Sequence, residues 1–278
     1  MTGKIAFQGE LGAYSHQACI ETRPALEPLP CRTFEDVIAA VQAGEADTAM
    51  LPVENTTYGR VADIHRLLPE SGLHIVDEAF VRVHINLLGV PGTAVSDVDE
   101  AFSHLVLLPQ CGTFLRENNI TGRVSPDNAR AAREVAEAGD KTKAALASEL
   151  AAEVYGLDVV ARHIEDNDHN TTRFLVMERE PNNARRSDDM LTTFVFRVRN
   201  IPAALYKAMG GFATNGVNMT KLESYYDSDS FTATEFFVDI EGHEGMANVA
   251  RAIEELRFHS KHVRLLGTYE QERERGGS

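Results

Sequence analysis

Apolar residues recur with two different periods in the first part of the chain, which predicts strands alternating with helices. Residues 3–8 and 47–53 are short apolar runs typical of buried strands. Residues 34–41 place apolar side chains on one helical face, and Gly44 should end that helix. A second helix is expected over residues 61–69. Strands that alternate with helices favour parallel sheets, whose ligands bind at the carboxyl ends of the strands.

The longest apolar and alternating stretch, residues 73–88, exceeds the length of one short strand. We expect it to leave a first lobe and enter a second one. The elements expected in the second lobe alternate in the same way: strands at 105–108, 144–147 and 158–164, and helices from 109, at 128–138 and at 148–155. The chain should then return to the first lobe through an acidic loop, residues 165–168.

A polar segment without periodicity, residues 179–189, is the clearest linker in the chain. Beyond it the expected order is βαββαβ, the ferredoxin-like split unit. Its elements are expected at 190–198, 202–214, 217–225, 231–240, 245–256 and 263–269. The sequence therefore predicts an α/β protein with a two-lobed region (1–180), a smaller domain (190–270) and a tail (271–278). Lobe one should comprise about 1–80 and 165–180, and lobe two about 81–164.

Charge and composition narrow the possible partners. The 278 residues include 27 Lys and Arg against 42 Asp and Glu, a formal net charge of −15. Nucleic acid and anionic membrane surfaces need a basic footprint, so neither is an expected partner. No apolar run approaches the roughly 20 residues that cross a bilayer, and no signal sequence is evident, so we expect a cytoplasmic location. An anionic substrate would need a locally positive site, built from a few arginines and oriented backbone amides.

The potential metal ligands are dispersed. Cys19, Cys31 and Cys111 are widely spaced, which fits neither a disulfide framework nor a metal cluster. The ten histidines form no metal-binding motif. We therefore expect reduced cysteines and no metal site.

Polar side chains gather where predicted strands begin or end. Residues 170–174 (NTTRF) place two hydroxyl groups and a guanidinium group at the start of a strand. Because a strand turns successive side chains to opposite faces, Thr172 and Phe174 should share a face that Arg173 does not. Asn55 follows the strand at 47–53. These residue types are also ordinary strand chemistry, and the glycine turn before Ser15 can be either an anion site or a simple turn.

Four segments, in the right order, resemble those of monofunctional bacterial prephenate dehydratases. Residues 7–15 (FQGELGAYS) are similar to the glycine-rich N-terminal segment of that family. Residues 51–56 (LPVENT), followed by 59–61 (GRV), match its Pro-x-Glu-Asn-Ser/Thr segment. Ser103, Gln110 and Cys111 match its Ser-His…Gln-Cys segment, although residues 105–106 are Leu-Val in place of Pro-Gln. Residues 172–174 are its Thr-Arg-Phe signature.

The resemblance implies a catalytic region folded like a two-lobed type II periplasmic binding protein, with the substrate in the cleft, followed by an ACT regulatory domain. It also implies conversion of prephenate to phenylpyruvate, with loss of water and carbon dioxide, in L-phenylalanine biosynthesis. Since aromatisation of the ring drives this reaction, no metal or organic cofactor is expected.

The same resemblance assigns roles to residues. Thr172 is the candidate donor to the departing hydroxide. Asn55, Ser103 and Gln110 would orient the substrate, and Glu54 would help to hold that segment. Arg173 could bind a substrate carboxylate through a bidentate fork, or could instead pair with the acidic loop. The remaining candidate contacts with the substrate are Tyr14, Ser15, Thr56 and Phe174.

The C-terminal domain departs from the ACT pattern in two segments. In Pro202, Ala203, Ala204 and Leu205 an alanine replaces the usual glycine, and Glu223 and Ser224 are followed by two tyrosines in place of Arg-Pro. Further candidate effector residues are Asn215, Val217, Asn218 and Leu222. Allosteric feedback regulation with L-phenylalanine as the effector is expected, and whether L-phenylalanine still inhibits stays open because of these replacements. An effector site shared between paired domains implies a homodimer or homotetramer.

Two other functions remain open. Arogenate dehydratase acts on a substrate that differs only by an amino group on the side chain. A non-catalytic, amino-acid-sensing binding protein is the alternative from a different class, because both folds host such functions. The joint presence of Asn55, Ser103, Gln110 and Thr172 argues against a sensor, which needs no donor to a leaving group.

Overall fold

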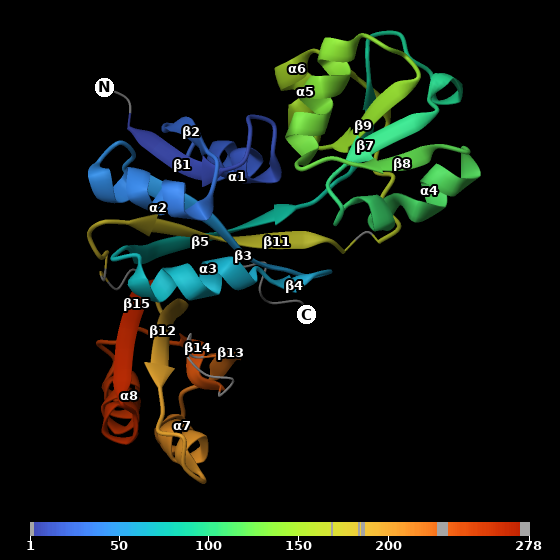
Figure 1. Ribbon diagram of the computed structural model, residues 1–278. Coiled ribbons are helices and arrows are strands. Elements are labelled where there is room, and N and C mark those ends of the chain that lie inside the picture. The colour runs from blue at the N-terminus through green and yellow to red at the C-terminus, as the bar shows by residue number, and fades with distance from the viewer. Residues whose placement is uncertain (1–2, 168, 183, 185–186, 227–232, 273–278) are drawn as a thin grey trace. The chain divides into compact units, whose positions relative to one another are not determined.

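The computed structural model describes residues 3–167, 169–182, 184, 187–226 and 233–272 (Figure 1). The chain divides into two compact units. Unit 1 comprises Met1–Val61 and Phe80–Phe174, and unit 2 comprises Ala62–Ala79 and Leu175–Ser278. No helix among the described residues has the length and apolar character needed to span a membrane.

The first sheet has the strand order β2-β1-β3-β11-β5, and β1 pairs in parallel with both β2 and β3. Its strands are β1 (Lys4–Gln8), β2 (Glu27–Cys31), β3 (Thr48–Asn55), β5 (His74–Arg82) and β11 (Thr171–Glu178), and the short β4 (Gly59–Arg60) pairs with β3. Helices α1 (Tyr14–Thr22) and α2 (Phe34–Ala43) pack on this sheet, and α3 (Ala62–Leu67) with the 3-10 turn η1 (Leu68–Glu70) follows β4. The predicted alternation of strands and helices is confirmed here.

The ends of α2 show why the sequence specifies this helix. The Thr33 hydroxyl accepts a hydrogen bond from the Asp36 amide, and the Asp36 carboxylate accepts one from the Thr33 amide. This reciprocal capping box satisfies amides that the helix leaves without partners. Gly44 ends the helix in the left-handed conformation, with φ 78°, which residues with a side chain rarely adopt.

The second sheet has the order β10-β6-β9-β7-β8. β7 pairs in parallel with β8 and β9, whereas β6 runs antiparallel to β9 and β10. Its strands are β6 (Asn86–Gly89), β7 (Glu100–Ser103), β8 (Thr121–Val124), β9 (Lys143–Ala147) and β10 (Asp158–Ala161). Its helices are α4 (Gly112–Glu117), α5 (Asn128–Ala138) and α6 (Glu149–Tyr155), with 3-10 turns η2 (Val95–Asp97) and η3 (Leu108–Cys111). Figure 1 shows α5 and α6 side by side, with α5 packed on β9.

The apolar stretch 73–88 changes sheets as expected, but as two strands. β5 belongs to the first sheet and β6 to the second, and residues 83–85 separate them. The expectation of parallel sheets is correct for the pairings of β1 with β2 and β3 and of β7 with β8 and β9, whereas β6 pairs antiparallel with β9 and β10.

One predicted strand was wrong, and the predicted strands did not include β2, β4, β7 and β8. The apolar run 105–108 is a turn leading into η3, because the His104 carbonyl accepts hydrogen bonds from the amides of Leu107 and Leu108. Leu105 is 62% exposed, so the apolar character of this run did not indicate a buried strand. β2 was not among the predicted strands. It contains Pro28 and Pro30 and lies at the edge of the sheet, where a proline needs no partner for its missing N–H.

Unit 2 contains the predicted βαββαβ order, folded into a four-stranded antiparallel sheet of order β13-β14-β12-β15. The elements are β12 (Met190–Arg197), α7 (Ala204–Thr214), β13 (Met219–Tyr226), β14 (Ala233–Glu241), α8 (Ala247–His259) and β15 (His262–Glu270). Helices α7 and α8 share one apolar core with the sheet, which includes Phe194, Phe212 and Leu256. The expected strand residues 231–232, part of the linker (183 and 185–186) and most of the tail (273–278) lie outside the described residues.

Residues 62–79 are fastened to this C-terminal fold. A Cβ atom on Gly267 of β15 would lie 2.0 Å from the Ile75 carbonyl oxygen, so the two backbones approach as only glycine permits. The Arg264 guanidinium donates to the Pro69 carbonyl, and the Glu272 amide donates to the Glu78 carboxylate over 3.0 Å. The segment that follows the Asn55 loop is thus part of unit 2.

Candidate active site

The loop after β3 is tied to the start of β11. The Thr56 amide donates to the Thr171 carbonyl over 3.0 Å, and the Thr171 amide donates to the Thr56 hydroxyl over 2.9 Å. That hydroxyl in turn donates to the His169 carbonyl over 2.6 Å. Thr56, a predicted contact with the substrate, therefore binds the backbone of His169 and Thr171. These bonds keep the neighbouring Asn55 beside Thr172.

The orientation of the Asn55 amide is set by the backbone. Its Oδ1 accepts hydrogen bonds from the amides of Thr57 (2.9 Å) and Tyr58 (3.1 Å). Its Nδ2 must therefore face the other way, where it donates to Asn170 Oδ1 over 2.6 Å and to Thr172 Oγ1 over 3.0 Å. The Thr172 hydroxyl is thus an acceptor for Asn55.

The hydroxyl hydrogen of Thr172 has no acceptor among the residues that the structure describes. Because the oxygen already accepts from Asn55, the hydrogen is available to a molecule placed beside it. Thr172 itself is partly exposed. This is the arrangement that a hydrogen-bond donor to a leaving group requires.

Gln110 joins the same network through Asn170. Asn170 Nδ2 donates to Gln110 Oε1 over 2.5 Å, and Gln110 Nε2 donates to the Val106 carbonyl over 3.0 Å. We call Asn55, Asn170 and Gln110 the amide relay. Asn170 was absent from the predicted site residues; its position two residues before Thr172 was the only signal in the sequence.

Ser103 lies outside the amide relay. Its hydroxyl is fully buried at the end of β7, where it donates to the Leu146 carbonyl over 2.8 Å and lies 3.3 Å from Asn128 Oδ1. No hydrogen bond joins Ser103 to the amide relay within the described part of the chain. The serine holds β7 to β9 and orients Asn128, which also accepts from the His104 amide over 3.2 Å.

Arg173 is one of the largest fully buried side chains, only 2% exposed. Its guanidinium donates to Glu54 Oε1 over 2.8 Å. Two carboxylates of the acidic loop hold other groups: Glu165 binds His84 and the Ile85 amide, and Asp166 binds the Thr113 amide. The third, at position 168, lies outside the described residues. The ion pair with Glu54 favours a structural role.

Tyr14 and Ser15 begin α1. The Tyr14 hydroxyl donates to the His84 carbonyl over 2.8 Å, and burial, with smaller effects from Cys111 and Glu165, raises its pKa well above the ordinary value. Tyr14 therefore remains a neutral donor to the protein backbone. Ser15 is the second residue of a helix whose N-cap, Ala13, has no capping side chain.

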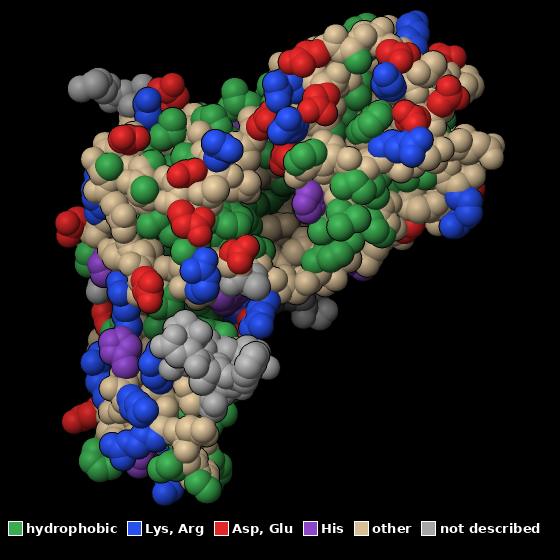
Figure 2. Space-filling model, viewed as in Figure 1, with side chains coloured by type: hydrophobic (Ala, Val, Ile, Leu, Met, Phe, Trp, Pro, Cys, Tyr) green, Lys and Arg blue, Asp and Glu red, His purple; other side chains and the backbone are tan. Residues whose placement is uncertain are grey.

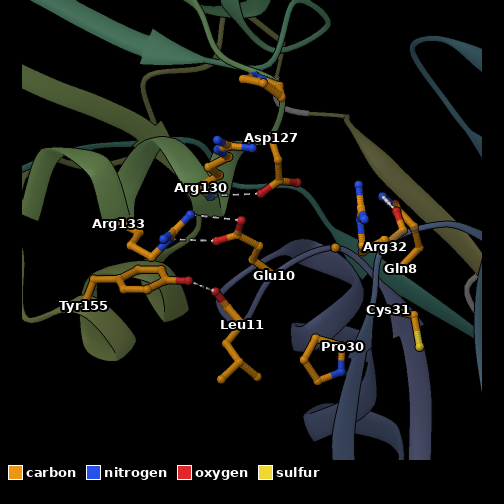
Figure 3. A pocket seen from close by; sticks show the side chains of 12 residues that line it. Gln8, Glu10, Leu11, Pro30, Cys31, Arg32, Asp127, Arg130, Arg133 and Tyr155 are labelled. Carbon is orange, nitrogen blue, oxygen red and sulfur yellow. Dashed lines mark hydrogen bonds and ion pairs between the residues drawn. The ribbon is translucent and has the colours of Figure 1, made fainter. Parts of the chain in front are cut away.

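A pocket of about 800 Å³ opens between the glycine turn and the start of α5 (Figure 3). None of the five predicted catalytic residues lines it. Figure 3 shows Arg130 and Arg133 on the α5 side and Arg32 on the other side. Arg133 makes a two-pronged ion pair with Glu10, at 3.0 and 3.2 Å, and the Tyr155 hydroxyl donates to the Leu11 carbonyl over 2.7 Å.

The pocket is locally positive, as an anionic ligand requires. Its lining contains three arginines and two carboxylates, in a chain with a formal net charge of −15. Figure 2 shows acidic and basic side chains interspersed over the visible face. Within the described chain, no group of three or more histidine, cysteine, aspartate or glutamate side chains is arranged to hold a metal ion.

Asp127, the N-cap of α5, lines this pocket, and its carboxylate accepts from the Arg130 amide over 3.0 Å. Burial raises its pKa, aided by nearby Glu10 and opposed by backbone amides and His104. The folded protein therefore holds this proton to higher pH than the unfolded chain, whose pKa is about 3.9, and ionisation penalises folding as the pH rises above that value.

Asp127→Asn keeps the capping oxygen and removes the charge. The free energy of unfolding of Asp127→Asn, minus that of the wild type, is expected to increase from pH 4 to pH 7.5. Urea unfolding at each pH would measure this difference. A difference that stays constant over this range, or that decreases as the pH rises, would contradict the prediction.

The predicted effector residues lie at both ends of α7. Ala203 is the N-cap, with Pro202 before it and Ala204 and Leu205 opening the helix; Asn215 caps the other end, followed by Val217 and Asn218. Eleven helical residues span about 16 Å, so one copy of unit 2 does not bring the two groups together.

The other predicted effector residues lie on β13. Leu222 and Ser224 are exposed, and Glu223 lies 3.4 Å from Lys221 and 3.7 Å from the buried His65 of α3. His65 packs edge-on against Phe237. The effector segment around Glu223 thus contacts the helix that follows the Asn55 loop.

Ala203 adopts a conformation suited to glycine, with φ 61° and ψ 12°. The left-handed region costs a residue with a Cβ atom about 1 kcal/mol relative to glycine, so Ala203→Gly is expected to stabilise the protein by about 0.5 to 1 kcal/mol. Urea unfolding would measure this gain. The matched control is Ala204→Gly, at the first right-handed position of α7, which is expected to destabilise. Equal effects of the two changes would refute the explanation.

Comparison with known proteins shows the family to which the chain is similar. The model of the prephenate dehydratase family matches residues 5–182. A bifunctional N-acyl-homoserine lactone acylase/prephenate dehydratase of Komagataeibacter europaeus is 49% identical, over 95% of both chains. The arogenate dehydratase/prephenate dehydratase 1 of Arabidopsis thaliana is 34% identical, over 96% of this chain and 71% of the relative.

Two solved structures are similar over nearly the whole chain. One, described as GqqA, a novel type of quorum quenching acylase, is 48% identical with a TM-score of 0.92, over 98% of this chain and 99% of that chain. The other is a prephenate dehydratase from Arthrobacter aurescens in complex with L-Phe; it is 29% identical with a TM-score of 0.88, over 96% of this chain and 90% of that chain.

Proposed function

The chain belongs to the prephenate dehydratase family of enzymes, and we propose that it converts prephenate to phenylpyruvate in L-phenylalanine biosynthesis. The observation that carries this proposal is the Thr172 hydroxyl, which accepts from Asn55 and keeps its own hydrogen for a ligand. Asn55, Gln110 and Thr172 are the residues proposed to face the reaction.

The difficult step is the departure of the ring hydroxyl of prephenate. The ring carboxylate leaves as carbon dioxide, and the electron pair of the broken C–C bond completes the aromatic ring. At the same time the C–O bond breaks, its electron pair stays on oxygen, and that oxygen leaves as water once protonated. A hydrogen bond from Thr172 to this oxygen strengthens as negative charge develops, which lowers the barrier.

The other predicted site residues take supporting roles in this proposal. Ser103 holds the end of β7 and, through Asn128, the loop at His104. Arg173 and Glu54 fix β11 against β3, so Arg173 acts through the position of Thr172. The substrate carboxylates are proposed to be attracted by the guanidinium groups of the pocket, Arg32 and Arg130, because Arg173 is committed to Glu54.

For domain organisation, we propose a catalytic region over residues 1–180 and an ACT regulatory domain over 190–270. The βαββαβ order supports the second assignment. The Arthrobacter aurescens protein, described in complex with L-Phe, supports L-phenylalanine as the effector. Because the effector residues lie at opposite ends of α7, a site that uses both needs a second copy of the chain, which supports a homodimer or homotetramer. The cytoplasm is the compartment proposed for this activity.

Related activities are the alternatives. Several relatives are named arogenate dehydratases, so arogenate is the second candidate substrate. The name of the relative at 49% identity adds N-acyl-homoserine lactone hydrolysis as a further candidate. A non-catalytic sensor would leave the donor at Thr172 without a task.

One experiment separates these functions. The purified chain is given prephenate, arogenate or an N-acyl-homoserine lactone, with and without L-phenylalanine, and phenylpyruvate, phenylalanine or the free acid is followed. We expect the highest kcat/KM for prephenate and a decrease on adding L-phenylalanine. Binding of L-phenylalanine without turnover of any substrate would instead establish a sensor.

A further inference from the structure

Asn170 links three segments that lie far apart in the sequence. It contacts Asn55, 115 residues away, and Gln110, 60 residues away, and it is only 1% exposed. We propose that Asn170 is a positioning residue that joins Asn55 to Gln110, holds both amides in the directions that their backbone partners set, and thereby maintains the orientation of the Thr172 hydroxyl. This inference rests on the proposed dehydratase function.

Both ends of the amide relay are anchored by backbone groups. At one end the amides of Thr57 and Tyr58 donate to Asn55; at the other the Val106 carbonyl accepts from Gln110. The Tyr58 hydroxyl also donates to Val106, which closes the network into a ring. A backbone amide can only donate and a carbonyl can only accept, so each side-chain amide between them has one permitted orientation.

The middle position of this ring has a strict chemical requirement. It must accept from Asn55 Nδ2 and donate to Gln110 Oε1, over 2.6 and 2.5 Å. An uncharged carboxamide of the length of asparagine meets both needs without a buried charge. A carboxylate would set one of its oxygens against Gln110 Oε1, and an aliphatic side chain would remove a hydrogen-bond partner from two partly buried amides, those of Asn55 and Gln110.

The consequence reaches Thr172 through Asn55. Asn55 Nδ2 has two hydrogens, one for Asn170 and one for Thr172. When Asn170 holds the first, the second is directed at Thr172 Oγ1, and the threonine hydrogen must point elsewhere. Without that contact the Asn55 side chain can rotate, and the threonine hydrogen can turn inward. Misalignment of a reacting group of this kind can cost on the order of 100-fold in rate.

Asn170→Asp gives the sharpest test, since its ionised form accepts from Asn55 but cannot donate to Gln110. We expect kcat for prephenate at pH 8 to fall about 10- to 100-fold relative to the wild type, with a smaller change in KM. As the pH falls and the new carboxyl group gains a proton, its O–H can donate to Gln110 in place of the amide. The ratio of the variant kcat to the wild-type kcat should therefore rise toward acidic pH. Effects of pH on kcat that both proteins share, such as any from His104 and His169, cancel in this ratio.

Asn86 provides a matched structural control. It is also an asparagine with 1% exposure in unit 1, and it contacts the backbone of Ala147 and His163 outside the amide relay. Asn86→Asp is expected to lower stability without a kcat ratio that recovers in acid.

A double-variant cycle shows whether Asn170 acts through Thr172. Asn170→Leu should lower kcat in the wild type but have little further effect when Thr172 is already valine. If the wild type turns over prephenate and Asn170→Asp matches its kcat at pH 8, or if the losses from Asn170→Leu and Thr172→Val multiply independently, the positioning role is overturned. An inactive wild type would instead overturn the proposed function itself.

Discussion

Replacing Thr172 with valine should lower kcat for prephenate by about 100- to 1000-fold, which corresponds to the roughly 3 to 4 kcal/mol lost when one transition-state donor is removed. Valine keeps the shape of threonine and its preference for strands, so β11 should form normally. The loss arises because the donor to the departing oxygen is gone. Steady-state kinetics with prephenate would measure it, and urea unfolding would verify the fold, with an expected cost of about 1 kcal/mol for the hydrogen bond from Asn55.

The serine variant is the control for Thr172. Thr172→Ser keeps the hydroxyl group and should retain far more activity than Thr172→Val, whereas Thr172→Ala should resemble valine. Thr171 immediately precedes Thr172. Its carbonyl accepts a hydrogen bond from the Thr56 amide, but among the described residues its side chain makes no hydrogen bond to the amide relay. Thr171→Val should therefore have a small effect. Near-normal turnover by Thr172→Val or Thr172→Ala would remove Thr172 from the mechanism.

Local chemistry explains which elements the sequence predicted correctly. The capping box at Thr33, the cap at Asp127 and the glycine after α5 are contained within a few neighbouring residues. These signals need no tertiary information, so α2 and α5 were predicted at nearly their observed bounds. The βαββαβ order of unit 2 was also predictable, because each of its elements is long and strongly periodic.

Elements that depend on position within a sheet were harder to predict. The prolines of β2 are compatible with a strand only at a sheet edge, and an edge cannot be recognised before the sheet is known. Leu105 shows the complementary error, because an apolar run without burial on both faces became a turn.

The candidate site divides in the same way. Thr172, Asn55 and Gln110 were predictable because they lie in motifs of the family. Asn170 and the partner of Arg173 were not, since both depend on which strands become neighbours. β3 and β11 are adjacent in the first sheet although more than a hundred residues separate them in the sequence, and this adjacency brings Glu54 to Arg173 and Asn55 to Asn170.

Removing Glu54 is expected to destabilise the protein more than removing Arg173. The Arg173 side chain is 2% exposed, whereas that of Glu54 is 33% exposed. Glu54→Ala leaves a guanidinium group buried with one fewer charged partner, which should cost about 3 kcal/mol in the free energy of unfolding. Arg173→Met keeps the length of the side chain and leaves a carboxylate that water can reach, so its cost should be about half as large.

The double variant separates a structural ion pair from a substrate contact. When Arg173 is already methionine, Glu54→Ala no longer strands a buried charge, so the double variant should be more stable than Glu54→Ala alone. Under conditions in which Arg173→Met is folded, its KM for prephenate should lie within about threefold of the wild-type value, because the guanidinium group of the wild type pairs with Glu54. A variant as stable as the wild type but with KM raised by about 100-fold would reverse the assignment and place the Arg173 guanidinium on a substrate carboxylate.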